Sequence, residues 1–104
     1  MKMTKITAYI NDGDMWHHQA LYLAVLQMLH ENGIAGGTVL HAVAGFTNKG
    51  AVNTTTLVDV GGKLPLVIQF IDTHEKVKSV LPDLVTMVGT RLVISEEVQV
   101  INYS

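Results

Sequence analysis

Cysteine is missing from this chain of 104 residues, which excludes disulfide bonds, thiolate chemistry and zinc sites built on cysteine. Charge is also scarce: 15% of the residues are charged, against about a quarter in typical proteins. The seven Lys and Arg residues do not cluster, and the formal net charge is -2. Nucleic-acid-binding proteins need a basic stripe that displaces counterions from phosphates, so the sequence argues against nucleic acid as a partner.

Long hydrophobic runs are absent as well. No apolar run reaches the roughly 18 residues of a membrane-spanning helix, and the first residues, MKMTKITAYIND, lack the apolar region of a signal peptide. We therefore expect a cytoplasmic protein that is not embedded in a membrane. Aromatic residues make up 6% of the chain, too few for the stacking surface of an RNA-recognition module. No patterned nucleophile, histidine and acid suggest a catalytic triad.

Four segments have the composition of β-strands, rich in apolar and β-branched residues. In the first of them, Ile6, Ala8 and Ile10 alternate with more polar residues. The predicted strands span residues 5–11, 38–46, 64–72 and 91–103. We expect an interruption of the last strand near residues 95–97 and a long loop over residues 47–62.

Two segments have the helical spacing of apolar residues. The first covers residues 17–32 and ends before Gly33, where a left-handed C-terminal cap belongs. The second begins after Asp72, which we expect to form a capping box with Glu75. Pro82 lies inside the second pattern and lacks a backbone N–H donor, so we expect a kink there.

The resulting order, βαββαβ, is the ferredoxin-like α+β pattern, a four-stranded antiparallel sheet with both helices on one face. We expect residues 1–104 to form a single domain of this kind. The other face of such a sheet should be polar, yet the strands at 38–46 and 64–72 have apolar residues at both odd and even positions, which point to opposite faces. Because no third layer is left in the chain, we expect other subunits to cover this face.

The stretch from Gly33 to Phe46 resembles a motif of the PII signal-transduction superfamily. It begins Gly-Ile-Ala-Gly-Gly-Thr-Val and ends Gly-Phe, like the run that lies between the first helix of PII proteins and their T-loop. The likeness extends to the little-characterised PII-like branch, a domain family of unknown function; the nitrogen-regulatory PII proteins and the CutA proteins are more distant. The further matches are Ala20-Leu21-Tyr22, Leu64-Pro65 and residues 92–100.

This resemblance implies a signalling protein that forms a homotrimer, is not an enzyme and needs no cofactor. In the superfamily a small effector binds in clefts between subunits and changes the conformation of the T-loop, here residues 46–62, which controls a client such as a transporter or an enzyme. Thr38 would bond to an adenine edge, and glycines would let the ligand approach the backbone closely. The ligand-binding residues we infer are Thr38, His41, Gly45, Phe46, Lys49, Lys63, Gly89 and Arg91.

Three departures from the superfamily limit the chemical class of ligand that we expect. Residues 47–62 lack the modifiable tyrosine of PII T-loops, and Gly-Thr-Arg-Leu-Val at 89–93 replaces a Gly-Asp-Gly-Lys phosphate loop. The few cations suit a mono- or diphosphate, a cyclic nucleotide or a small anion better than a triphosphate with roughly four charges. His41 stands where the PII-like branch often has arginine. It could bind an anion or respond to pH, or it could be a histidine whose hydrogen bonds are made at a subunit interface.

Two alternative functions stay open. Asp12, Asp14, His17 and His18 are metal-ligand types, and a CutA-like divalent-metal-binding protein would use them. Their spacing is poor, however, because adjacent helical residues point about 100° apart and chelating histidines on helices lie at i and i+4. We expect a helical first turn stapled by Trp16 and no metal site. The further alternative is a small enzyme, since a ferredoxin-like fold does not fix function.

Overall fold

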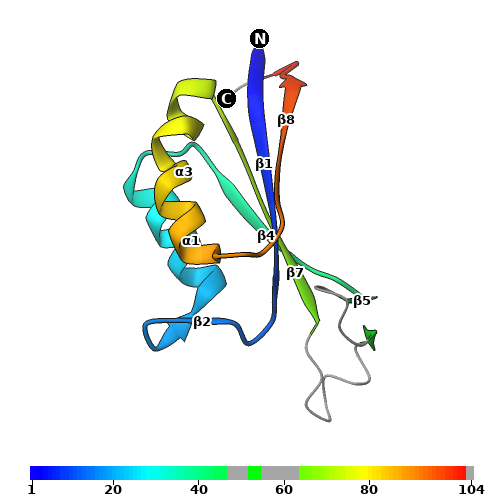
Figure 1. Ribbon diagram of the computed structural model, residues 1–104. Coiled ribbons are helices and arrows are strands. Elements are labelled where there is room, and N and C mark those ends of the chain that lie inside the picture. The colour runs from blue at the N-terminus through cyan, green and yellow to red at the C-terminus, as the bar shows by residue number, and fades with distance from the viewer. Residues whose placement is uncertain (47–51, 55–63, 103–104) are drawn as a thin grey trace.

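A four-stranded antiparallel sheet with two helices on one of its faces forms the body of the protein (Figure 1). The computed structural model describes residues 1–46, 52–54 and 64–102. The strand order across the sheet is β4-β7-β1-β8. The main elements are β1 (Lys2–Asn11), α1 (Leu21–Glu31), β4 (Gly37–His41), β7 (Pro65–Asp72), α3 (His74–Val88) and β8 (Val93–Gln99). This architecture confirms the predicted ferredoxin-like α+β fold.

The hydrophobic core lies between the sheet and the two helices. Antiparallel pairing of β1 with β7 sets Ile6 opposite Phe70 and Ala8 opposite Ile68, and all four are at most 2% exposed. Alternate side chains of a strand share a face, so these positions all point toward the helices. The helices contribute Leu21, Val25 and Leu29 from α1 and Val77, Val80 and Leu84 from α3. Within the described ranges, neither helix is long and apolar enough to cross a membrane.

The first helix is shorter than predicted. α1 begins at Leu21, and the preceding residues form a small hairpin in which β2 (Met15–Trp16) pairs with β3 (Gln19–Ala20). His17 and His18 connect these strands, with left-handed φ values of 47° and 69°. A two-residue connection of this handedness matches the twist of the strands that it joins. The prediction that the helix starts at residue 17 is therefore wrong.

The second predicted strand is divided into two. β4 ends at His41, and β5 (Ala44–Gly45) pairs with β6 (Asn53–Thr54) in a separate two-stranded sheet. The backbone N–H of Ala42 still donates to the carbonyl of Pro65 at 3.0 Å, so the chain leaves the main sheet just after this residue. The predicted loop over 47–62 therefore contains a strand, and its other residues except Val52 lie outside the described ranges.

The start of α3 also differs from the prediction. Thr73 is the N-cap, and its hydroxyl oxygen accepts a hydrogen bond from the backbone N–H of Lys76 at 3.2 Å. Asp72 is buried one residue earlier, and its carboxylate accepts hydrogen bonds from the backbone N–H groups of Ala35 at 2.9 Å and Thr73 at 2.7 Å. Asp72 therefore ties the turn between α1 and β4 to the start of α3, which continues as one helix through Pro82.

The sheet face away from the helices, called the open face below, carries exposed apolar side chains. Leu40, Ile71 and Ile94 are 48%, 38% and 37% exposed. The register of the strands places all three on the side opposite to the core. The open face is thus partly apolar, because the same register also places Lys5, Thr38 and Gln69 on it.

The sheet has β4 at one edge and β8 at the other. β8 runs unbroken from Val93 to Gln99, so the expected interruption near residues 95–97 is not found. Glu96 and Glu97 of β8 are both exposed. The ammonium group of Lys2 lies 3.6 Å from the carboxylate of Glu97, in an ion pair that is itself largely exposed.

Candidate functional site

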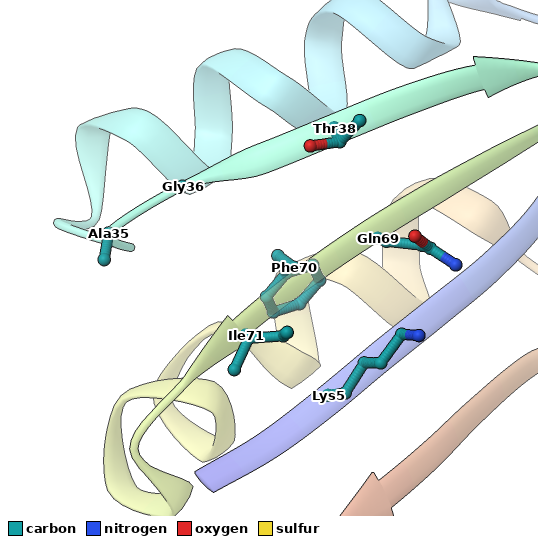
Figure 2. Close-up of a pocket in the computed structure, with 7 residues that line it drawn as sticks. All are labelled: Lys5, Ala35, Gly36, Thr38, Gln69, Phe70 and Ile71. Carbon is teal, nitrogen blue, oxygen red and sulfur yellow. The ribbon is translucent and has the colours of Figure 1, made fainter. Parts of the chain in front are cut away.

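A pocket on the open face contains Thr38 together with two polar residues that the sequence did not single out (Figure 2). We call it the Thr38 pocket; its volume is about 340 Å³. The pocket is lined by Lys5, Ala35, Gly36, Thr38, Gln69, Phe70 and Ile71. Among the predicted ligand-binding residues within the described ranges, Thr38 alone lines it.

The polar side chains of this pocket come from three adjacent strands. Thr38 of β4 pairs with Gln69 of β7, and Lys5 of β1 pairs with Ile71, two residues further along β7. Diagonal neighbours on adjacent strands are about 7–8 Å apart, which long side chains can bridge. Figure 2 shows Lys5 and Gln69 extending from neighbouring strands on the same side of the sheet. The pairing register is what brings the lysine and the glutamine together.

The turn between α1 and β4 forms one wall of the pocket. Gly33 has a left-handed φ of 76°, which confirms the predicted helix cap. Neither Gly36 nor Gly37 is left-handed. A Cβ atom at Gly37 would lie 3.2 Å from Cδ2 of Leu26, which explains why a residue without a side chain packs there against α1. A Cβ atom at Gly36 would meet no described atom within 4 Å, so the pocket remains open beside this residue.

The root of the predicted T-loop lies where the chain leaves the sheet. Gly45 pairs with Asn53 through the β5–β6 ladder. A Cβ atom at Gly45 would lie 3.0 Å from Cγ of Pro65, so a larger residue would require the Pro65 ring to shift. Phe46 follows and is 58% exposed. Close packing at the loop root therefore favours glycine at position 45, whatever its part in ligand binding.

Arg91 is held in place by two contacts within the protein. Its Nε donates to Oδ2 of Asp14 at 3.0 Å, and its Nη1 donates to the carbonyl of Val88 at 2.9 Å. Oδ2 of Asp14 also accepts the backbone N–H of Asn11 at 2.8 Å. The Asp14 side chain is 10% exposed and that of Arg91 is 31% exposed, so the guanidinium still reaches solvent. A guanidinium has five N–H donors, which leaves several for a further acceptor.

The other predicted site residues lie away from the Thr38 pocket. His41 is exposed at the end of β4, where its partner in the register is Leu66 of the core side. Gly89 ends α3 with a left-handed φ of 62°, which favours glycine on conformational grounds alone. Lys49 and Lys63 lie outside the described residues. The ligand-binding roles of all these residues stay predictions.

The candidate metal ligands are dispersed in the structure. His17 and His18 form the exposed hairpin connection, and Asp14 is engaged with Arg91. Trp16 is half-buried against the core, and its ring meets that of His17 edge-on at 4.4 Å between centroids. The described part of the chain contains no group of three or more His, Cys, Asp or Glu residues that could hold a metal ion.

The fold, with its strand order and its loop root beside β7, is the ferredoxin-like fold found in PII-like proteins. The structure is similar to the solved structure of CPII bound to ADP and bicarbonate, from Thiomonas intermedia K12, with a TM-score of 0.63 and 17% sequence identity. This similarity covers 96% of this chain and 89% of that chain. At such low identity the comparison shows the fold alone.

The chain belongs to the DUF190 family, described as an uncharacterized ACR, which it matches over residues 3–100. A UPF0166 protein from Methanocaldococcus jannaschii is 30% identical over 83 residues, covering 80% of this chain and 74% of the relative. A UPF0166 protein from Aquifex aeolicus is 26% identical over 84 residues, covering 81% of this chain and 80% of the relative. The resemblance to a PII-like family of unknown function is thereby confirmed.

Proposed function

We propose that this protein is a PII-like regulator that binds a small ligand in clefts between the subunits of a homotrimer. The ligand is an adenine nucleotide or a small anion. Its binding changes the conformation of the T-loop, residues 46–62, and thereby controls a partner such as a transporter or an enzyme. On this proposal the protein acts in the cytoplasm and does not catalyse a reaction.

One feature of the fold supports a cleft between subunits most directly: Thr38 and Arg91 lie at opposite edges of the sheet. Thr38 is in edge strand β4, and Arg91 shortly precedes edge strand β8. Three strand intervals of about 4.8 Å separate these edges by about 14 Å. A compact ligand can contact both residues only where the β4 edge of one subunit lies beside the β8 edge of another. The predicted site thus requires more than one copy of the chain.

The open face supports the same assembly. The exposed side chains on this face include Leu40, Ile71 and Ile94. Contact of such apolar surface with water is unfavourable. Burial of this surface against neighbouring subunits would contribute roughly 25 cal/mol for each Å² of apolar area removed from water. The Thr38 pocket opens on this face, so a subunit packed there would also enclose the ligand.

The loop root connects the ligand-binding strand to the T-loop, so ligand binding can change the conformation of the loop. β4, which carries Thr38, is separated from β5 by only two residues, and Gly45 of β5 packs on Pro65. A ligand that contacts one arrangement of this segment better than another shifts the population toward it. The name of the CPII structure mentions ADP and bicarbonate, and both belong among the ligands to test.

The first test is thermal unfolding of the chelator-treated protein with AMP, ADP, ATP, cyclic nucleotides, bicarbonate and divalent metals. A ligand at 100 times its dissociation constant should raise the free energy of unfolding by about 2.7 kcal/mol. Thr38→Val should weaken that response. Thr86→Val, an exposed substitution on α3, is the matched control and should keep it.

Sedimentation equilibrium of the same samples measures the assembly state. A trimer together with a nucleotide or anion response that depends on Thr38 would support the proposal. A monomer at all protein concentrations, with no stabilising ligand in the panel, would overturn it. Stabilisation by a metal alone, lost when His17 and His18 are replaced by alanine, would favour the CutA-like alternative.

A further inference from the structure

We propose that the Thr38 pocket contains a subsite for a monoanionic carboxylate, bound by Lys5, Gln69 and Thr38. The apolar body of the same molecule lies along Ile71. This inference deepens the proposed function, on which it rests, by specifying the chemical class of one ligand group and two residues that bind it. It extends the predicted site to strands β1 and β7.

The convergence of free polar groups is the first argument. In the part of the chain that the structure describes, the side chains of Lys5, Thr38 and Gln69 take part in no hydrogen bond or ion pair. All three line the same pocket, and Lys5 and Gln69 are half-buried. Their polar atoms reach water, because none of the buried side-chain nitrogen and oxygen atoms in the described ranges lacks a partner. A ligand that accepts hydrogen bonds could therefore replace water at all three groups without breaking a contact within the protein.

The donor types fit a carboxylate. An ammonium group has three donors and no acceptor, an amide NH₂ has two donors, and a hydroxyl has one. A carboxylate is acceptor-only at two oxygens, so it can take bonds from Lys5 and from Gln69 or Thr38 at once. The bond from the ammonium group is charge-assisted and stronger than a neutral hydrogen bond.

The charges around the pocket favour a single negative charge. Among the lining residues that the structure describes, Lys5 is the only cation. One carboxylate, that of Glu96, lies beside it, because Glu96 pairs with Lys5 in the register on the side away from β7. A di- or triphosphate placed here would bring several negative charges to one lysine that already has a carboxylate neighbour. A monoanion balances the lysine and adds little repulsion.

The apolar part of the lining gives the ligand a second feature. Ile71 lines the pocket on the same face as the polar groups and is 38% exposed. A volume of about 340 Å³ exceeds what a bare carboxylate fills. An alkyl body beside Ile71 would use this space, and each fully buried CH₂ group should tighten binding by roughly fourfold.

The test is an NMR titration of the full-length protein with sodium acetate, sodium butyrate and ADP, at ionic strength held constant with sodium chloride. We expect saturable shifts of the Gln69 side-chain amide with acetate, and tighter binding of butyrate. Lys5→Met should weaken butyrate binding by about tenfold or more, because the charge-assisted bond is lost. Lys2→Met, on the same strand but outside the pocket, is the control and should bind like the wild type.

Gln69→Leu gives a second, independent variant, which should weaken butyrate binding if the amide is a donor. Equal butyrate affinities for wild type, Lys5→Met and Lys2→Met would overturn the subsite. ADP binding that survives in such a case would leave the proposed function standing. Carboxylate binding that depends on Lys5, without any nucleotide response, would instead support the subsite and remove the nucleotide from the proposed function.

Discussion

Asp72→Ala should lower the free energy of unfolding by about 3 kcal/mol. The carboxylate accepts two backbone hydrogen bonds, from Ala35 at 2.9 Å and from Thr73 at 2.7 Å. Each bond to a charged acceptor contributes about 1.5–3 kcal/mol, and we take the lower value because Ala35 is exposed, so water can partly replace its partner. Asp72→Asn keeps one acceptor oxygen and should lose about half as much.

Urea denaturation followed by circular dichroism measures these changes, at one fixed protein concentration because subunit association also affects stability. Thr73→Ala is the matched control: it removes only the N-cap bond of α3 and should cost about 1 kcal/mol. The reasoning would be refuted if Asp72→Ala cost no more than Thr73→Ala. Equal losses for Asp72→Asn and Asp72→Ala would show that the negative charge, and not the number of acceptors, decides the effect.

Two further substitutions test local geometry. Replacing His17-His18 by Asn-Gly should raise the free energy of unfolding by about 1 kcal/mol, because both positions are left-handed and Asn-Gly suits such hairpin connections. The same urea titration measures this change. An unchanged urea midpoint would contradict the prediction. Gly45→Val should abolish ligand-dependent protease protection of residues 46–62 while the trimer persists, because its Cβ would lie 3.0 Å from Pro65. Limited proteolysis and sedimentation measure the two effects, and full protection in the variant would disprove the role of the loop root.

The fold could be predicted where the pattern of apolar residues is regular. β1 alternates with a period of two, β7 is a short apolar run that begins at Pro65, and α3 has a long apolar stripe, so their positions were predicted closely. The β2–β3 hairpin was not, because His17-His18 is an unusual connection and the residues around it fit a helical pattern equally well. The cap at Thr73 was displaced by one residue because Asp72, a good N-cap by type, bonds instead to another segment.

The candidate site was harder to predict, because it depends on register. Thr38 was found through the resemblance of its motif to PII proteins. Lys5 and Gln69 are 64 residues apart in the sequence (69 − 5), and only the pairing of β1 with β7 shows that they are neighbours. One signal was present: Gln69 is a polar residue between apolar residues of its strand, at the parity opposite to the core. The pairing of Arg91 with Asp14 left no comparable signal.

The difference in charge between the two sheet edges has a consequence for symmetry. β8 carries Glu96 and Glu97, whereas β4 consists of Gly, Thr, Val, Leu and His. Two β8 strands paired antiparallel around these glutamates would set carboxylates against carboxylates, which is destabilising. Contact between a β4 edge and a β8 edge avoids this repulsion. Such a contact is heterologous and forms a ring when its rotation closes. Two β8 edges would instead form a two-fold dimer, so the acidic strand disfavours a dimer through β8 before any ligand binds.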